Sequence, residues 1–316
     1  MKKFILKPAI FVTICLSGFL LFSSCNKNDN NPAPPASGTI TDVVSADADL
    51  SLLKTGVVKA DLATTLSGPG PFTLFAPTDE AFAAAGITSD VINSLPTDDL
   101  SNLLLYHVID SKILAADVPA GPNAKVITAS GDSVFVTNNA NGVFVNGAQV
   151  TQADIMATNG VVHKINAVLM PAVGNLVVSA QADTSLTYLV AAVLRASTGS
   201  TDVASVLSGS NILTLFAPTN NAFRAAGFAT IDDINASDPD VLAGILTYHV
   251  VSGRIFSSDL TNGEQATTLN GGSITISTSA SVTVKGNSNT SAANVVKANT
   301  VATNGVIHKI DQVLLP

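Results

Sequence analysis

The chain contains the same stretch of sequence twice. Residues 72–82 read FTLFAPTDEAF and residues 213–223 read LTLFAPTNNAF, identical at 8 of 11 positions. The tripeptide YHV at 106–108 returns at 248–250. The two pairs are offset by 141 and 142 residues, which is the size of a domain, whereas solenoid repeats recur every ~20–50 residues. The sequence therefore predicts two copies of one domain.

The end of each copy sets the expected domain boundaries. Residues 148–171 and 293–316 are identical at 14 of 24 positions, with an offset of 145. We expect the first domain to span 39–171 and the second to span 172–316. Domains of this size can hold a hydrophobic core of their own, because they bury about two thirds of the surface of the unfolded chain.

The N-terminal segment reads as a targeting signal. Residues 9–22 are apolar and follow three lysines, and such a stretch is shorter than the ~20 residues that cross a bilayer. Ser23 and Ser24 precede Cys25, an arrangement that resembles a bacterial lipobox. We therefore expect residues 1–24 to be a lipoprotein signal peptide, Cys25 to carry the lipid, and residues 25–38 to be a flexible Asn/Pro-rich linker. The alternatives are an ordinary secretory signal with an incidental cysteine, and an uncleaved membrane anchor.

Composition excludes several classes of function. Both cysteines, Cys15 and Cys25, lie in the leader, so neither domain has a disulfide or a reactive thiol. The chain has 15 basic and 23 acidic residues and a net charge of −8, without a cluster of Lys or Arg. Because affinity for nucleic acid rests on neutralised phosphates, nucleic acid is not an expected partner.

Local patterns predict helices early and strands late in each copy, which is an α+β arrangement. Thr78 is expected to cap a helix after a buried strand, and Asp98 is expected to cap a helix over 99–106. Asp238 is the expected cap in the second copy, with Pro239 at the first helical position. The expected strands are 72–76, 133–137, 142–146 and 161–165, with 273–277, 281–285 and 306–310 in the second copy.

These motifs together resemble the fasciclin (FAS1) domain. The resemblance rests on TLFAPT at 73–78, YHV at 106–108 and NGVVHKI at 159–165, which recur in the same order in the second copy. It implies an α+β fold of two tandem FAS1-like domains. Each would be a β-wedge or sandwich of two sheets with helices packed along one edge.

The resemblance also implies a role in adhesion and matrix contact. In animal relatives the Tyr-His element is assigned to integrin contact, so the matching residues are the candidate adhesion or binding residues: Tyr106, His107, Tyr248 and His249. A bacterial lipoprotein is not expected to have evolved for integrins. The assignment of these residues as candidate binding residues is therefore transferred to this chain, and the integrin ligand is not.

The sequence predicts neither an enzyme nor a cofactor. All four histidines lie in repeated motifs, at 107, 163, 249 and 308, without a cysteine or a His-x-x-x-His pair to complete a metal site. We expect structural, hydrogen-bonded histidines and no metal; a weak site made by two histidines and a carboxylate is the alternative. No nucleophile or phosphate-loop motif is present, so no catalytic residue is expected.

The expected function is that of a cell-envelope lipoprotein in the outer membrane, either periplasmic or surface-exposed, which mediates adhesion or association with matrix or polysaccharide. Its partners would be the membrane, through the lipid anchor, and a cell-surface or matrix protein or a polysaccharide. The alternative is a periplasmic or outer-membrane accessory protein that binds a small molecule or a glycan. Specificity is expected where the copies differ, as at Asp79-Glu80 against Asn220-Asn221.

Overall fold

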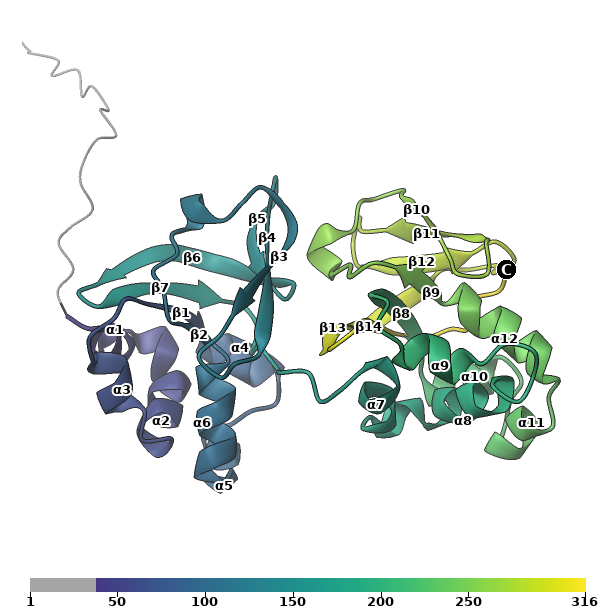
Figure 1. Cartoon of the computed structure of the whole chain (residues 1–316), viewed down its shortest axis with the longest axis horizontal. Coiled ribbons are helices and arrows are strands. Elements are labelled where there is room, and N and C mark those ends of the chain that lie inside the picture. Colours follow the sequence, from purple (N-terminus) through teal and green to yellow (C-terminus); the bar gives the residue numbers. More distant parts are fainter. Residues whose placement is uncertain (1–37) are drawn as a thin grey trace, which may run out of the picture. The chain divides into compact units, whose positions relative to one another are not determined.

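The computed structural model describes residues 38–316. The predicted signal peptide, Cys25 and residues 25–37 of the predicted linker lie outside the described residues. Within 38–316, no helix is both long enough and apolar enough to cross a membrane. The two copies have the same order of elements, and in each a group of short helices precedes most of the strands (Figure 1).

Each domain has six short α-helices and two single-turn 3-10 helices. Those of the first domain are α1 (Ile40–Ala46), η1 (Ala48–Leu50), α2 (Ser51–Lys59), α3 (Ala63–Ser67), α4 (Asp79–Ala84), α5 (Ser89–Ser94), α6 (Thr97–Leu105) and η2 (Ala115–Asp117). Those of the second domain are α7 (Leu176–Gln181), η3 (Thr184–Leu186), α8 (Thr187–Ala196), α9 (Val203–Ser208), α10 (Asn220–Ala225), α11 (Ile231–Asn235), α12 (Pro239–Tyr248) and η4 (Ser257–Asp259).

Each domain also has seven strands in one mixed sheet. In the first domain the spatial order is β2-β1-β7-β6-β5-β4-β3, and in the second it is β10-β11-β12-β13-β14-β8-β9. The bounds are β1 (Phe72–Pro77), β2 (Val108–Ile109), β3 (Gly121–Ile127), β4 (Ser133–Asn139), β5 (Gly142–Val145), β6 (Ala148–Ala157) and β7 (Gly160–Ile165), then β8 (Leu213–Pro218), β9 (Val250–Ser252), β10 (Gln265–Thr267), β11 (Ser273–Ser277), β12 (Thr283–Gly286), β13 (Ala293–Ala302) and β14 (Gly305–Ile310).

The repeated motifs form the centre of each sheet. β1 pairs with β7 in parallel, as β8 does with β14, and the remaining ladders are antiparallel. The predicted α+β class is thus confirmed. The strands expected to form two sheets make one continuous order, because the long strand β6 pairs with β7 along most of its length and with β5 at its beginning.

The long strand is irregular in both copies. The register between β6 and β7 shifts twice, between Val150 and Gln152 and between Gln152 and Ile155. Bulges of this kind re-aim side chains and local backbone groups. The residues at the irregularity, Asp154 and its counterpart Asn299, have positive φ values of 58° and 64°. In each copy the backbone N–H of this residue donates a hydrogen bond to a histidine of the neighbouring strand, His163 or His308.

The central strands separate two hydrophobic cores in each domain. In the first domain Leu74 of β1 belongs to the core on the helix side, which also contains Phe82 of α4. The next residue, Phe75, faces the other core together with Tyr106 and Ile165. Successive side chains of a strand point to opposite faces, so one strand serves both cores. The second domain repeats this division.

Most predicted helix starts are confirmed, and one is wrong. The Oγ1 of Thr78 accepts a hydrogen bond from Ala81 N–H, and Asp238 caps a helix that begins at Pro239. Asp98 is not a cap, because α6 begins at Thr97, two residues before the predicted start, and Pro96 at the cap position makes no side-chain bond. Asp98 lies in the first turn, where the helix dipole favours an acidic group.

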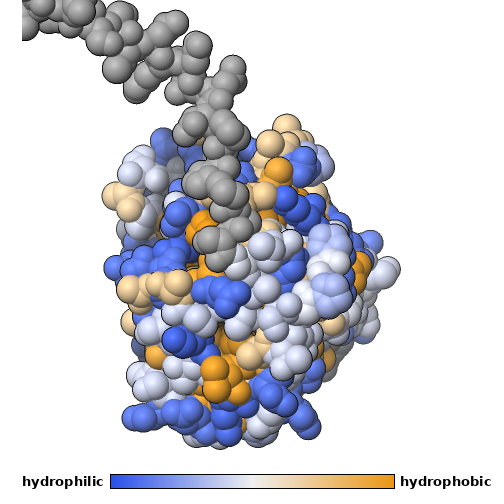
Figure 2. Space-filling model, turned by 90° about the vertical axis from the view of Figure 1, so that its left-hand side faces the viewer, coloured by the Kyte–Doolittle hydropathy of each residue, from blue (hydrophilic) through white to orange (hydrophobic). Residues whose placement is uncertain are grey.

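The surface of the chain is mixed in character. On the face drawn in Figure 2, hydrophobic residues appear as separate patches among hydrophilic ones. Leu194 of α8, for example, is 57 % exposed. Scattered exposed apolar residues are normal for folded proteins and do not define a docking surface.

Candidate functional site

The predicted adhesion residues of the first copy lie inside the domain. Tyr106 and His107 are each 1 % exposed. The Tyr106 hydroxyl donates to the carbonyl oxygen of Ser133 at 3.0 Å and accepts from the Asn146 side-chain amide at 2.9 Å. Burial raises the pKa of Tyr106 to about 12. Tyr106 thus connects the end of the helical region to the beginning of β4 and the turn after β5.

The second copy places its tyrosine in the same way. Tyr248 is fully buried and donates to Ser273 O at 2.5 Å, while its hydroxyl accepts from Asn287 N–H at 2.9 Å. The hydroxyl therefore accepts from a side-chain amide in the first domain and from a backbone amide in the second. In both cases it connects the tyrosine to the turn. In both domains the tyrosine therefore connects the core to the beginning of one strand (β4 or β11) and to the turn that comes after the next strand (β5 or β12).

The adjacent histidine connects the helices to the C-terminal segment of each domain. His107 Nδ1 lies 2.8 Å from Leu103 O, and its Nε2 accepts from Leu169 N–H at 2.9 Å. Since Nε2 must be unprotonated to accept, the proton is on Nδ1 and the ring is neutral. His249 repeats this geometry with Ile245 O and Leu314 N–H. Burial lowers the pKa of both histidines to about 4.

The second histidine of each copy holds the bulged strand. His163 Nδ1 accepts from Asp154 N–H at 3.2 Å, and its Nε2 lies 2.9 Å from Ile113 O. His308 makes the matching bonds to Asn299 N–H and Ile255 O. These rings carry their proton on Nε2, the opposite tautomer from His107 and His249.

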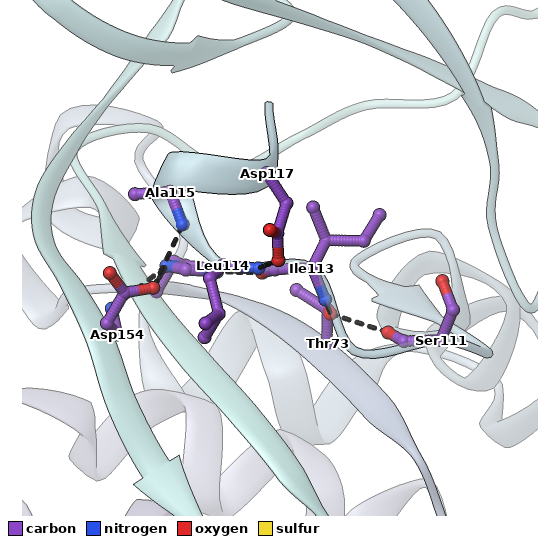
Figure 3. A network of polar contacts seen from close by, with 8 residues as sticks. Thr73, Ser111, Ile113, Leu114, Ala115, Asp117 and Asp154 are labelled. Atoms are coloured by element: carbon purple, nitrogen blue, oxygen red, sulfur yellow. Dashed lines mark hydrogen bonds and ion pairs between the residues drawn. The ribbon is translucent and has the colours of Figure 1, made fainter. Parts of the chain in front are cut away.

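The segment from Ser111 to Asp117 is tied down at each step (Figure 3). Thr73 Oγ1 donates to Ser111 O at 2.6 Å and accepts from Ile113 N–H at 2.9 Å. The next two amides, of Leu114 and Ala115, donate to the carboxylates of Asp117 and Asp154 at 3.0 and 2.9 Å. In the second copy Thr214, Asp259 and Asn299 make the same connections.

The polar residues of both copies therefore form one repeated scaffold. No group of three or more His, Cys, Asp or Glu residues in 38–316 is arranged to hold a metal ion. A fasciclin domain model matches residues 48–171 and again residues 188–316. The chain belongs to the fasciclin domain family.

Relatives of this fasciclin chain come from animals and bacteria. It is 31 % identical to pig transforming growth factor-beta-induced protein ig-h3 over 256 residues, covering 79 % of this chain and 35 % of that protein. It is 32 % identical to human periostin, covering 79 % of this chain and 29 % of periostin. Against Protein sll1483 of Synechocystis the identity is 40 %, over 42 % of this chain and 73 % of that protein.

The fasciclin chain spans about a third of the length of these animal relatives. Among solved structures, it is similar to a FAS1 domain pair from the insect cell adhesion molecule Fasciclin I, with a TM-score of 0.41 and 20 % sequence identity. That match covers 87 % of this chain and 96 % of the other.

One structural residue of each fasciclin domain was not singled out from the sequence. Asn159 accepts from Ile40 N–H at 2.9 Å and donates to Leu66 O and Gly68 O, both at 2.8 Å. Asn304 makes the same three bonds in the second domain, to Leu176, Leu207 and Gly209. From sequence, Asn159 and Asn304 are recognised only as parts of the motif that ends each copy. Its repetition in both copies was the one available sign of a further role.

One difference between the copies also serves the scaffold. Asp79 accepts from Leu52 N–H at 2.8 Å and from the Ser51 hydroxyl at 2.6 Å. Asn220 occupies the matching place and accepts from Tyr188 N–H at 3.0 Å. A carboxylate and an amide oxygen both connect the start of α4 or α10 to the preceding long helix. The adjacent difference, Glu80 against Asn221, lies on the surface.

Replacing Tyr106 by phenylalanine should lower the stability of the first fasciclin domain while leaving its surface unchanged. The variant loses the bond to Ser133 O and leaves the buried Asn146 amide without its partner. An unsatisfied buried donor costs ~1–3 kcal/mol. Chemical denaturation of the mature chain would measure the loss, and Tyr248→Phe should do the same in the second domain. An unchanged unfolding free energy would contradict the structural role.

Proposed function

We propose that this chain is a cell-envelope lipoprotein whose two fasciclin domains mediate adhesion or association with matrix or polysaccharide. The observation that carries the proposal is the match of the fasciclin model to both copies. The family is associated with adhesion and matrix contact. Anchoring through Cys25 is part of the proposal and rests on the sequence of the leader.

The use of the polar core supports a binding role rather than a catalytic one. The four histidines and the two motif tyrosines have hydrogen-bond partners within the fold. A general base or nucleophile has to reach a substrate, whereas these side chains form hydrogen bonds with other residues of the same domain. We therefore expect Tyr106, His107, Tyr248 and His249 to support adhesion by positioning surface loops, not by touching a partner.

The contact surface should lie where the copies differ. The scaffold residues recur, whereas two pairs of matching loops differ in sequence. The β4–β5 turn next to Asn138 corresponds to the longer loop at 278–282, and the β5–β6 turn at 146–147 corresponds to the longer loop at 287–292, which begins with Asn287. Exchanging one of these loops for its counterpart should alter binding without large loss of stability. Exchanging a helix of the first copy for its counterpart would disturb the hydrophobic core, and this variant serves as the control for loss of stability.

The anchor can be tested separately from binding. The mature protein should incorporate labelled palmitate in the cell envelope, and Cys25→Ala should abolish the label and release the protein from the membrane fraction. Protease treatment of intact cells then reports whether the domains face outward. Retention of the label in Cys25→Ala would exclude lipidation at this residue.

Removing one domain should weaken adhesion far more than twofold. Two linked binding modules raise the effective concentration of the second contact to the millimolar range, so avidity can exceed the affinity of one module by 10²–10⁴. Adhesion of cells carrying the two-domain chain would be compared with cells carrying either domain alone, after thermal unfolding has shown that each single domain is folded. Equal adhesion by a folded single domain would exclude avidity.

A further inference from the structure

We propose that the first domain binds the end of a short aliphatic chain in its strand-side core. An apolar cavity of about 180 Å³ lies there. The apolar residues that line it include Phe75, Ile113, Val118, Val136, Val143 and Val150. The cavity reaches the surface beside the segment drawn in Figure 3, since Ile113, Val143 and Val150 are only partly buried. This inference is independent of adhesion.

The chemistry of the lining selects an apolar occupant. Its two polar members are His163 and Asp117. Both ring nitrogens of His163 already have backbone partners, and the Asp117 carboxylate accepts from Leu114 N–H. Among the described residues that line the cavity, no buried side-chain nitrogen or oxygen lacks a hydrogen-bond partner. Apolar cavities of ~150 Å³ stay dry and take up molecules such as benzene, so this cavity can hold about six heavy atoms of a hydrocarbon.

The second copy carries different side chains at three positions of this lining. Leu260 follows η4 at the place where Val118 follows η2. Ile276 pairs with β12 as Val136 pairs with β5. At both positions the second domain carries one more methylene group. At the third position the second domain has the smaller side chain, because Val126 of the first domain corresponds to Ala266, which has two carbons fewer. The variant described below therefore adds the two larger side chains while keeping Val126, so that it reduces the volume of the cavity.

The charge at the mouth restricts the head group of the ligand. Asp117 is exposed at the edge of the cavity, and Asp154 holds the same segment from its other side through Ala115 N–H. A carboxylate head group would meet like charges there, and opposite or neutral groups would not. The ligand class is therefore an aliphatic chain with a neutral or cationic head, such as an alcohol or an amine.

The test uses the mature two-domain chain and three probes of equal chain length: 1-hexanol, hexylamine and hexanoate. Calorimetry should show saturable binding of the first two and at least tenfold weaker binding of hexanoate. The variant Val118→Leu/Val136→Ile, which introduces the side chains of the second domain, should lose at least tenfold in affinity. Val58→Ile adds a methylene at a residue of α2 that is 66 % exposed, and should bind as the parent does.

A second measurement does not depend on the variant. In the unmodified chain, nuclear Overhauser contacts should join the terminal methyl of 1-hexanol to the methyl groups of Val136 and Val143. No saturable binding of any probe, contacts elsewhere in the molecule, or full affinity in a folded Val118→Leu/Val136→Ile variant would each overturn the site. Equal binding of hexanoate and hexylamine would overturn the assignment of the head group.

Discussion

Gly160→Ala should prevent the first domain from folding, and Gly305→Ala should do the same in the second. A Cβ atom at Gly160 would lie 2.1 Å from the carbonyl oxygen of Phe72, and at Gly305 it would lie 2.0 Å from that of Leu213. Real Cβ contacts are not this short, and the obstructing atoms belong to the backbone of the neighbouring strand. The strands must therefore move apart.

The consequence is large because of where these glycines lie. Gly160 and Phe72 are the first pair of the parallel β1–β7 ladder, which separates the two cores of the domain. Moving β7 disturbs both cores and the three hydrogen bonds of the adjacent Asn159. Effects above ~4 kcal/mol are exceptional for single substitutions and arise from such overpacking or from the loss of buried bonds. Since domains have total stabilities of ~5–15 kcal/mol, we expect loss of the folded domain.

Calorimetry of the mature chain can separate the two domains. Gly160→Ala should remove the transition of the first domain and keep that of the second. Gly244→Ala is the matched control, because a Cβ there meets nothing within 4 Å and the residue lies inside α12. Alanine is favoured over glycine in a helix by ~0.5–1 kcal/mol, so this variant should be as stable as the parent or more so. A Gly160→Ala protein that melts like the parent would contradict the close approach.

Much of the fold was predictable from the sequence because the same motifs occur in both copies, in the same order. The strands at 72–77 and 160–165 have strong apolar patterns, and the Thr78 cap has a local signature. Strand boundaries shifted by a residue or two, since local patterns do not determine where pairing ends. The fold class followed from the order of helices and strands, together with the resemblance to a known domain.

The roles of individual polar residues could not be predicted, because their partners are far away in sequence. Lys164 is part of an apolar strand, and its ammonium group lies 2.6 Å from Asp47 and 3.0 Å from Asp49, more than a hundred residues earlier. Lys309 pairs with Asp183 in the second domain. The candidate adhesion residues present the same problem. The motif identified them as a unit, but only the structure shows that both side chains of each pair point inward.

The stability of both domains should fall between about pH 6.5 and pH 4 because of His107 and His249. The pKa of each is lowered to about 4, mainly by burial, which disfavours the charged ring. In the unfolded chain a histidine titrates near pH ~6.5. Within this window the unfolded state binds more protons than the folded state, so the free energy of unfolding decreases as the pH falls.

The expected size follows from the same values. Linkage gives a loss of about 2 kcal/mol per histidine between pH 7.5 and pH 5, approaching ~3 kcal/mol at pH 4. Burial also lowers the pKa of His308, which adds to the loss in the second domain. Carboxylates act in a different range: the pKa of Asp183 is lowered to about 2, so its contribution is lost only below pH ~4.

Urea denaturation at several pH values would measure this loss, and His107→Gln supplies the comparison. That variant is expected to be less stable than the parent at pH 7.5, because glutamine cannot reproduce both hydrogen bonds of the ring. Its first domain should nevertheless show a flatter pH dependence between pH 7.5 and 5. Nuclear magnetic resonance of the parent tests the cause directly, since the ring protons of His107 and His249 should not titrate above about pH 5. A ring that titrates near pH 6.5 in the folded protein, or equal stability at pH 7.5 and pH 5, would show that the neutral histidine is not required to hold the helices to the C-terminal segment.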